Sequence, residues 1–134
     1  MSTFGVDLYT SRDGSVGSIT AATLVQGTAK AWFNLNGTGT ITARDDFNVA
    51  SYVDNGVGDY TCNFATARPN ANYSISGAVE PESPNVGLFF PFAGGNSSTL
   101  SIPLTSSFRW ISANGGMGSV DRGRNVATVH GDPN

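Results

Sequence analysis

From about residue 28 onward, apolar and polar side chains alternate along short runs of the chain. Residues 31–35 and 60–64 show this most clearly, since every second residue in each run is apolar. A period of two places neighbouring side chains on opposite faces of an extended chain and predicts strands. Asn36-Gly37 and Asn55-Gly56 lie at the ends of such runs, and Asn-Gly pairs favour tight hairpin turns. The pattern predicts about eight to ten short strands spaced roughly 8–12 residues apart.

Short strands at this spacing are typical of antiparallel sandwiches and barrels. We therefore expect an all-β fold, an antiparallel β-sandwich that is jelly-roll-like. No window of roughly 11 residues shows a helical period, so no long helix is expected. The predicted core takes one apolar face of each strand and consists of Phe33, Leu35, Ile41, Phe47, Tyr60, Cys62, Phe64, Tyr73, Ile75, Phe90, Leu100, Ile102, Phe108 and Val126.

Residues 1–27 differ from the remainder of the chain because they are rich in small residues and poor in aromatic ones. Such a segment has too little apolar surface to form a core of its own. We expect an N-terminal arm over residues 1–27 and a β-sandwich domain over residues 28–134. The arm is an extended segment, a linker or an edge strand around Ile19 to Val25. It is either poorly ordered, as termini often are, or docked on a neighbouring chain.

Three of the predicted strands carry large apolar side chains on both faces. We expect Trp32, Phe89 and Ile111 to lie on the faces turned away from the core. A sandwich buries one face of each sheet, so apolar side chains on the other face indicate a subunit interface or a ligand platform. Contact between subunits is the favoured interpretation. A sugar-binding aromatic platform and scattered surface aromatics are the alternatives.

Composition narrows the possible partners. The chain has 134 residues, of which 13% are charged, and its formal net charge is −3. Nucleic-acid binding needs clustered Lys and Arg, so nucleic acid is not an expected partner. No apolar run approaches the roughly 18 residues of a membrane span, and no membrane insertion is expected. The first residues lack the basic and apolar regions of a Sec-type signal peptide, so none is expected.

The sequence contains few residues that are candidates for catalysis or metal binding. His130 and Cys62 are the single histidine and the single cysteine, so neither a disulfide nor a conventional zinc site is expected. The adjacent pair Asp45-Asp46 points to opposite sides of an extended chain, and Asp54 and Asp59 flank a predicted turn. We expect no catalytic residue, no metal and no cofactor, and we expect that the protein is not an enzyme.

Loops offer a second class of candidate contacts, because binding residues concentrate on loops carried by a rigid scaffold. The candidate loops span residues 80–85, 94–98 and 114–118. Their candidate binding residues are Asn85, Asn96, Asn114 and Met117. A receptor or a cell-surface glycan is the expected partner for such loops.

Three stretches carry a family resemblance. They are VQGTAKAWFNLNGTGTI from Val25, RDDFNV from Arg44 and DNGVGDYT from Asp54. Together they resemble small β-rich proteins and tail-fibre C-terminal domains of tailed bacteriophages and prophages. The resemblance covers roughly residues 25–112, and Asp46 stands where that family often has Ser.

This resemblance implies a virion structural protein made in the host cytoplasm. It implies a tail-fibre or appendage component that self-associates, as a homotrimer, and attaches to other virion proteins through the N-terminal arm. A capsid-decoration or head-fibre protein is one alternative. A receptor- or carbohydrate-binding module that takes part in host attachment is another.

Overall fold

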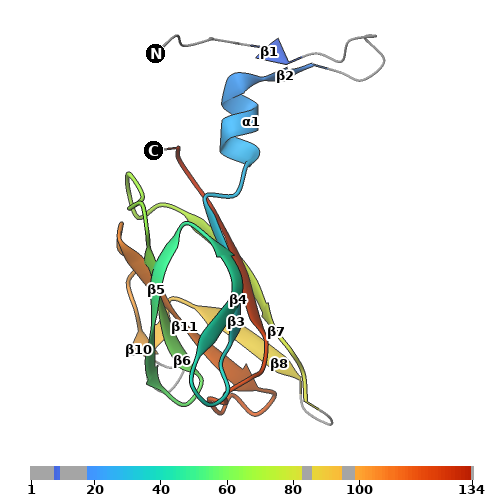
Figure 1. The fold of residues 1–134 in the computed structure, drawn as a ribbon, viewed down its shortest axis with the longest axis vertical. Coiled ribbons are helices and arrows are strands. Elements are labelled where there is room, and N and C mark those ends of the chain that lie inside the picture. Colours follow the sequence, from blue (N-terminus) through green and yellow to red (C-terminus); the bar gives the residue numbers. More distant parts are fainter. Residues whose placement is uncertain (1–7, 10–17, 83–85, 95–98, 134) are drawn as a thin grey trace.

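The computed structural model describes residues 8–9, 18–82, 86–94 and 99–133 of the chain (Figure 1). The elements in chain order are β1 (Leu8–Tyr9), β2 (Ile19–Thr20), α1 (Ala21–Gly27), β3 (Ala31–Asn36), β4 (Thr42–Phe47), β5 (Val49–Gly56), β6 (Asp59–Phe64), β7 (Ser74–Val79), β8 (Gly87–Pro91), β9 (Ala93–Gly94), β10 (Thr99–Leu100), β11 (Ser107–Asn114) and β12 (Asn125–His130).

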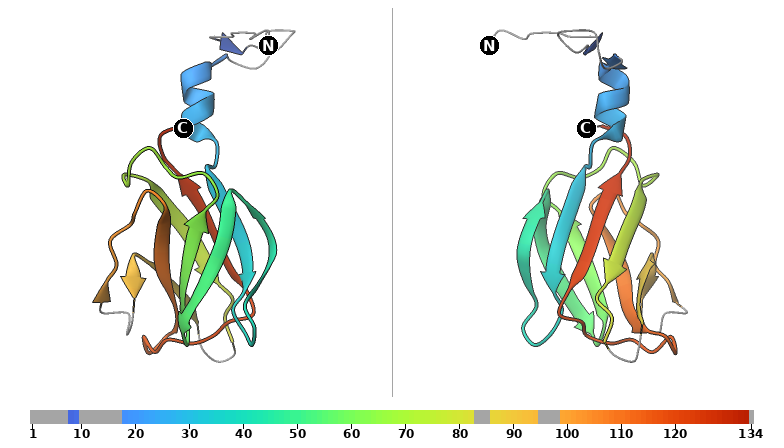
Figure 2. Two further views of the ribbon diagram at one scale, coloured as in Figure 1. Left: turned by 60° about the vertical axis from the view of Figure 1, so that its left-hand side comes forward. Right: turned by 90° about the vertical axis from the view of Figure 1, so that its right-hand side faces the viewer.

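Within the described residues, eight strands form two four-stranded antiparallel sheets that pack face to face (Figure 2). One sheet has the order β5-β6-β11-β8, and the other has the order β4-β3-β12-β7. The strands β3 and β4 pair as a local hairpin, as do β5 and β6, and later strands extend each hairpin. This arrangement confirms the expected all-β antiparallel sandwich.

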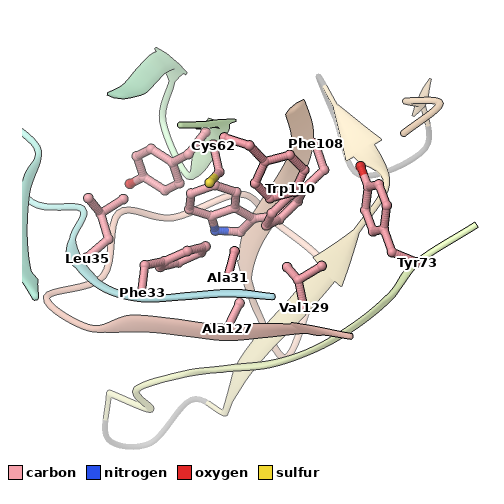
Figure 3. Close-up of a cluster of buried hydrophobic side chains, with 11 residues drawn as sticks. Ala31, Phe33, Leu35, Cys62, Tyr73, Phe108, Trp110, Ala127 and Val129 are labelled. Carbon is pink, nitrogen blue, oxygen red and sulfur yellow. The ribbon is translucent and has the colours of Figure 1, made fainter. Parts of the chain in front are cut away.

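The core between the sheets is built on aromatic side chains (Figure 3). Trp110 is fully buried on β11, and its ring centroid lies 4.8 Å from that of Phe33 and 5.4 Å from that of Tyr60. Phe108 adds a third ring at 5.7 Å from Trp110. Large aromatic groups remove much apolar surface from water and add ring-to-ring contacts, so they stabilise a sandwich of short strands.

The period of two correctly predicts which side chains of the central strands face the core. Along β3, Ala31, Phe33 and Leu35 are buried and alternate with half-buried neighbours. Cys62 and Phe64 do the same on β6. Alternation works here because each of these strands has a neighbour on both sides and a sheet packed over one face only.

Four residues of the predicted core face outward instead. Phe47 pairs directly with Trp32 on the outer face of its sheet and is 52% exposed. Val126 pairs with Asn34 on the same outer face. Ala127 and Val129, on the other face of β12, enter the core. Leu100 lies on β10, which pairs with β9 in a two-stranded ribbon outside the main sheets, and it is exposed. Ile102 follows β10 and is also exposed.

The predicted faces of β8 and β11 are partly wrong. Phe89, expected on the second face, lies on the core side, where its ring stacks on Trp110 at 6.2 Å. Its neighbour Phe90, expected in the main core, packs on the opposite face with Ile111 and Ala93. Ile111 does lie on that second face, but it is fully buried within its own chain. Within the described chain Phe89 is half-buried and Ile111 is fully buried, and their role as interface residues stays a prediction.

A short helix replaces the strand expected to reach Val25. The strand β2 covers Ile19–Thr20, and α1 follows over Ala21–Gly27. Thr20 caps this helix, because its hydroxyl accepts a hydrogen bond from the Thr23 amide at 3.1 Å. Seven residues are too few to give a helical period that a pattern analysis detects. In all views α1 stands beyond one end of the sandwich, close to the C-terminal residues (Figures 1 and 2).

Candidate functional site

Helix α1 has no buried residue. Leu24 is 37% exposed and Val25 is 40% exposed, and both lie within one turn of Ala21. Positions 21, 24 and 25 share one helix face, since residues three and four apart are neighbours on a helix. The helix therefore presents a short apolar stripe that the described part of the chain does not cover.

The connection from α1 to the sandwich is held by hydrogen bonds near residue 28. The Thr28 hydroxyl donates to the Val25 carbonyl at 2.9 Å, and the Lys30 ammonium donates to the Thr28 carbonyl at 2.7 Å. Gln26 reaches the C-terminal segment, where its amide donates to Asp132 at 3.3 Å. These contacts set the direction in which the helix leaves the sheet.

The outer face of the sheet β4-β3-β12-β7 carries the second candidate surface. Trp32 lies there, half-buried, and lines a hollow of about 520 Å³. Small side chains on β7, Ser76 and Ala78, leave room beside the indole. Thr128 and Asn34 supply hydroxyl and amide groups to the same hollow. The sequence correctly places Trp32 opposite Phe33, and its role as an interface residue stays a prediction.

Gly77 also lines this hollow, and it has a role in the core that pattern analysis misses. Gly77 lies on β7 between Ser76 and Ala78, and a Cβ atom at this position would come within 2.7 Å of the Phe89 ring. The glycine lets Phe89 approach the sheet from the core side. No sequence signal marks it, because the requirement arises from a side chain on the other sheet.

Two of the four candidate loop residues, Asn114 and Met117, lie in the described part of the chain. Asn85 and Asn96 lie outside the described residues. The side-chain Oδ1 atom of Asn114 accepts hydrogen bonds from the backbone amides of Gly116 and Gly118, both at 3.0 Å, so this side chain shapes its own loop. Met117 has a positive φ of 63° and is 63% exposed in the loop that follows β11.

Asp121 joins the loop before β12 to the turn between β5 and β6, because its carboxylate accepts hydrogen bonds from that turn and from β6. Its Oδ1 atom accepts from the Gly58 amide at 2.7 Å and lies 2.7 Å from the Tyr60 hydroxyl. Burial, with the nearby Asp121 carboxylate second, raises the pKa of Tyr60 well above its usual range. Beside this network lies a hollow of about 370 Å³ that contains Glu80 and an ion pair between Arg122 and Glu82. The charged side chains that line this hollow are three carboxylates and one guanidinium, so the hollow has an excess of negative charge.

The groups considered for catalysis have structural contacts. Asp46 accepts from the Tyr52 hydroxyl at 3.0 Å, and Asp54 accepts from the Gly56 amide at 2.9 Å. Asp59 forms an ion pair with Arg109 at 2.6 Å. His130 ends β12 opposite Ser74. Across the described ranges, no three His, Cys, Asp or Glu side chains gather as metal ligands would.

No helix in the described part of the chain is long and apolar enough to cross a bilayer. No protein-family model, curated protein or solved structure matches the chain. Functional inference therefore depends on the sequence resemblance and on the surfaces described above.

Proposed function

We propose that this chain is a structural protein of a bacteriophage virion, a tail-fibre or appendage component that self-associates and attaches to the particle through its N-terminal arm. The observation that carries the proposal is helix α1, which leaves the sandwich with an uncovered apolar stripe. The resemblance of residues 25–112 to phage tail-fibre domains supplies the biological setting.

A helix as short as α1 is not stable in water by propensity alone, since nucleation costs more than a few hydrogen bonds return. In proteins such helices are stabilised by packing of an apolar face. Among the described residues α1 has little such packing, because none of its residues is buried and Leu24 and Val25 are 37% and 40% exposed. Packing of the same stripe from neighbouring copies around a common axis gives Leu24 and Val25 a partner. We propose three copies in this assembly, because the resemblance to phage tail-fibre domains implies a homotrimer.

A second apolar region adjoins the helix and supports the same proposal. Val25 and Phe47 line one hollow, and Phe47 lies directly opposite Trp32 on the neighbouring strand. We call Leu24, Val25, Phe47 and Trp32 the α1–sheet surface. It runs from the helix onto the outer face of β3 and β4, so copies that meet through α1 bring this face close to a neighbour as well.

Particle incorporation tests the proposal. The double substitution Leu24→Asp with Val25→Asp places charges in the stripe, and we expect the variant to fold but to be missing from purified particles. The matched control is Val53→Asp with Val57→Asp, which changes two exposed valines on β5 and in the loop that follows it. We expect the control to be incorporated normally. Normal incorporation of the α1 variant would contradict attachment through this arm.

The alternative of a capsid-decoration or head-fibre protein is tested on the same particles. Separated heads and tails, probed for the chain, distinguish the two locations. The carbohydrate-binding alternative is favoured by the hollow beside Trp32, which combines an aromatic ring with the Asn34 amide and the Thr128 hydroxyl. A glycan array that shows binding lost in Trp32→Ala would support that function, and an array without hits would remove it.

A further inference from the structure

A hollow of about 390 Å³ lies where α1 and its linker meet the sandwich. It is lined by Val25 and residues 28–30 on one side, and by Phe47, Asn48, Thr66, Arg68 and Pro133 on the other. A volume of this size is typical of small-molecule pockets, which combine apolar walls with a few polar groups. The hollow therefore has room for a ligand as large as one sugar ring.

Arg68 is the unusual member of this lining. It is only 4% exposed, its Nε atom has no hydrogen-bond partner, and one terminal nitrogen donates to the backbone carbonyl of Asp132. Among the described residues, no carboxylate oxygen lies within 4.0 Å of the guanidinium. A buried cation is costly unless an anion pairs with it. Burial lowers the pKa of Arg68, and the nearby Asp132 carboxylate opposes this effect only in part.

Lys30 places a second cation at the same hollow. Its ammonium group donates to the Val25 carbonyl, to the Thr28 carbonyl at 2.7 Å and to the Thr28 hydroxyl at 3.1 Å, and no carboxylate oxygen of the described residues lies within 4.0 Å of it. Asp132 lies nearby, but its carboxylate oxygens accept hydrogen bonds from Gln26 and Asn70. Two cations and one carboxylate leave one positive charge in excess, which matches a ligand with one negative charge.

The rest of the lining favours an anion that also has an apolar face. Phe47 is 52% exposed, and with Val25 it offers an aromatic and aliphatic wall. Asn48 and Thr66 line the hollow with polar groups. A sugar ring with one carboxylate has this combination, because its C–H face packs on an aromatic ring and its hydroxyls bond to polar groups.

We propose that the hollow between α1 and the sandwich binds a carboxylate-bearing sugar, a hexuronate, with the carboxylate held by Arg68 and Lys30 and the ring packed against Phe47. The guanidinium fork suits a carboxylate because it donates two parallel hydrogen bonds. The hollow shares Val25 and Phe47 with the α1–sheet surface, whereas the two cations that hold the carboxylate lie outside that surface, so sugar binding and self-association are tested by different variants.

Titration of the full-length protein with glucuronic acid, followed by backbone amide NMR, tests the site. We expect saturable shifts at residues 28–30, 47–48 and 66–68, with a dissociation constant in the millimolar range that is usual for a single small ring. Glucose, which lacks the carboxylate, should give no saturable shifts. Inorganic phosphate and acetate should bind at least about tenfold more weakly, because they lack the ring.

Variants assign the binding to these side chains. Arg68→Met and Lys30→Met should each weaken glucuronate binding by about tenfold or more, as loss of a charged hydrogen bond does. Arg124→Met, at an exposed arginine outside the hollow, is the matched control and should bind as the parent does. The fold of Arg68→Met is checked by its melting temperature, because the change also removes the hydrogen bond to the Asp132 carbonyl and the charge that interacts with the Asp132 carboxylate. If this variant does not fold, Lys30→Met alone carries the test.

Three results would overturn the proposal. Absence of saturable shifts with glucuronate would show that the hollow binds no such sugar. Equal binding of phosphate or acetate would show a bare anion site. A lower solution mass for Lys30→Met or Arg68→Met, without sugar, would show that a carboxylate of a neighbouring copy fills the hollow. That last result would leave self-association intact, so it separates this proposal from the proposed function.

Discussion

Trp32 and Phe47 lie directly opposite each other on β3 and β4, and both face away from the core. Paired positions on adjacent antiparallel strands place their side chains on the same face, about 5 Å apart at the Cβ atoms. The pair thus forms an aromatic patch on the outside of a single chain. Self-association gives this patch a covered location, and α1 lies at the same end of the molecule as Phe47.

Substitution of the pair tests whether the patch is part of a subunit contact. Trp32→Ser with Phe47→Ser should lower the solution mass or raise the dissociation constant of the oligomer, because it removes apolar area from the contact. The melting temperature of the dissociated chain should change little, since neither side chain belongs to the core cluster. Val53→Ser, at an exposed valine on β5 of the other sheet, is the control. An unchanged mass for the double variant would exclude the patch from the contact.

The tight turn between β5 and β6 should be intolerant of a side chain. Gly58 has a φ of +65°, and a Cβ atom there would lie 2.4 Å from the Ser112 carbonyl oxygen. We expect Gly58→Ala to lower the free energy of unfolding by about 3 kcal/mol or more, from backbone strain and from a clash with backbone atoms.

Gly39 provides the matched comparison for that turn. Its φ is +63°, but no atom lies within 4 Å of the Cβ position. Gly39→Ala should therefore cost only the conformational term, about 1–2 kcal/mol. Urea unfolding of both variants gives the difference, and equal losses would show that the close approach at Gly58 adds nothing.

The ion pair between Asp59 and Arg109 should stabilise the outer side of the sheet β5-β6-β11-β8. Two hydrogen bonds of 2.6 Å join the carboxylate to the guanidinium, and the Asp59 side chain is almost fully buried. We expect Asp59→Asn to lower the free energy of unfolding by about 2 kcal/mol. A double-mutant cycle with Arg109→Met measures the coupling between the two residues. Additive losses in that cycle would contradict direct stabilisation by the pair.

Cys62 should be unreactive in the folded protein. Burial, with the Asp46 carboxylate as a smaller cause, raises the pKa of the Cys62 thiol to about 12. The reactive thiolate is therefore scarce at any pH below that value, and the sulfur is also inaccessible. At pH 8 a disulfide reagent should modify the protein only in denaturant, in parallel with unfolding. Rapid modification without denaturant would show that the core opens locally around β6.

Sequence reasoning reached the fold because the central strands obey simple alternation. Phe33, Cys62 and Phe108 enter the core as their period predicts. Alternation did not predict which side of β8 faces the core, because Phe89 and Phe90 are adjacent and both apolar. It also failed for Phe47, whose orientation follows its pairing with Trp32 and a register shift between Asn34 and Leu35.

The candidate surfaces were less predictable than the fold. The sequence indicated Trp32 as an exposed aromatic, and it predicted a docking role for the arm without showing that residues 21–27 form a helix. The hollow near Arg68 could not be foreseen, because residues 25, 47, 68 and 133 come together only in the folded chain. In the sequence, Arg68 precedes Pro69 and is predicted to lie in a turn, and nothing in that pattern predicts that its side chain is buried.

Static light scattering on the purified full-length chain is the most direct test of self-association. Because the proposed self-association would cover α1 and the adjoining aromatic patch, we predict a mass of about three times 13.9 kDa at micromolar concentration. The Leu24→Asp, Val25→Asp variant should shift the mass towards that of one chain. A single species of 13.9 kDa for the unchanged protein would contradict the proposal that this chain assembles through its N-terminal helix.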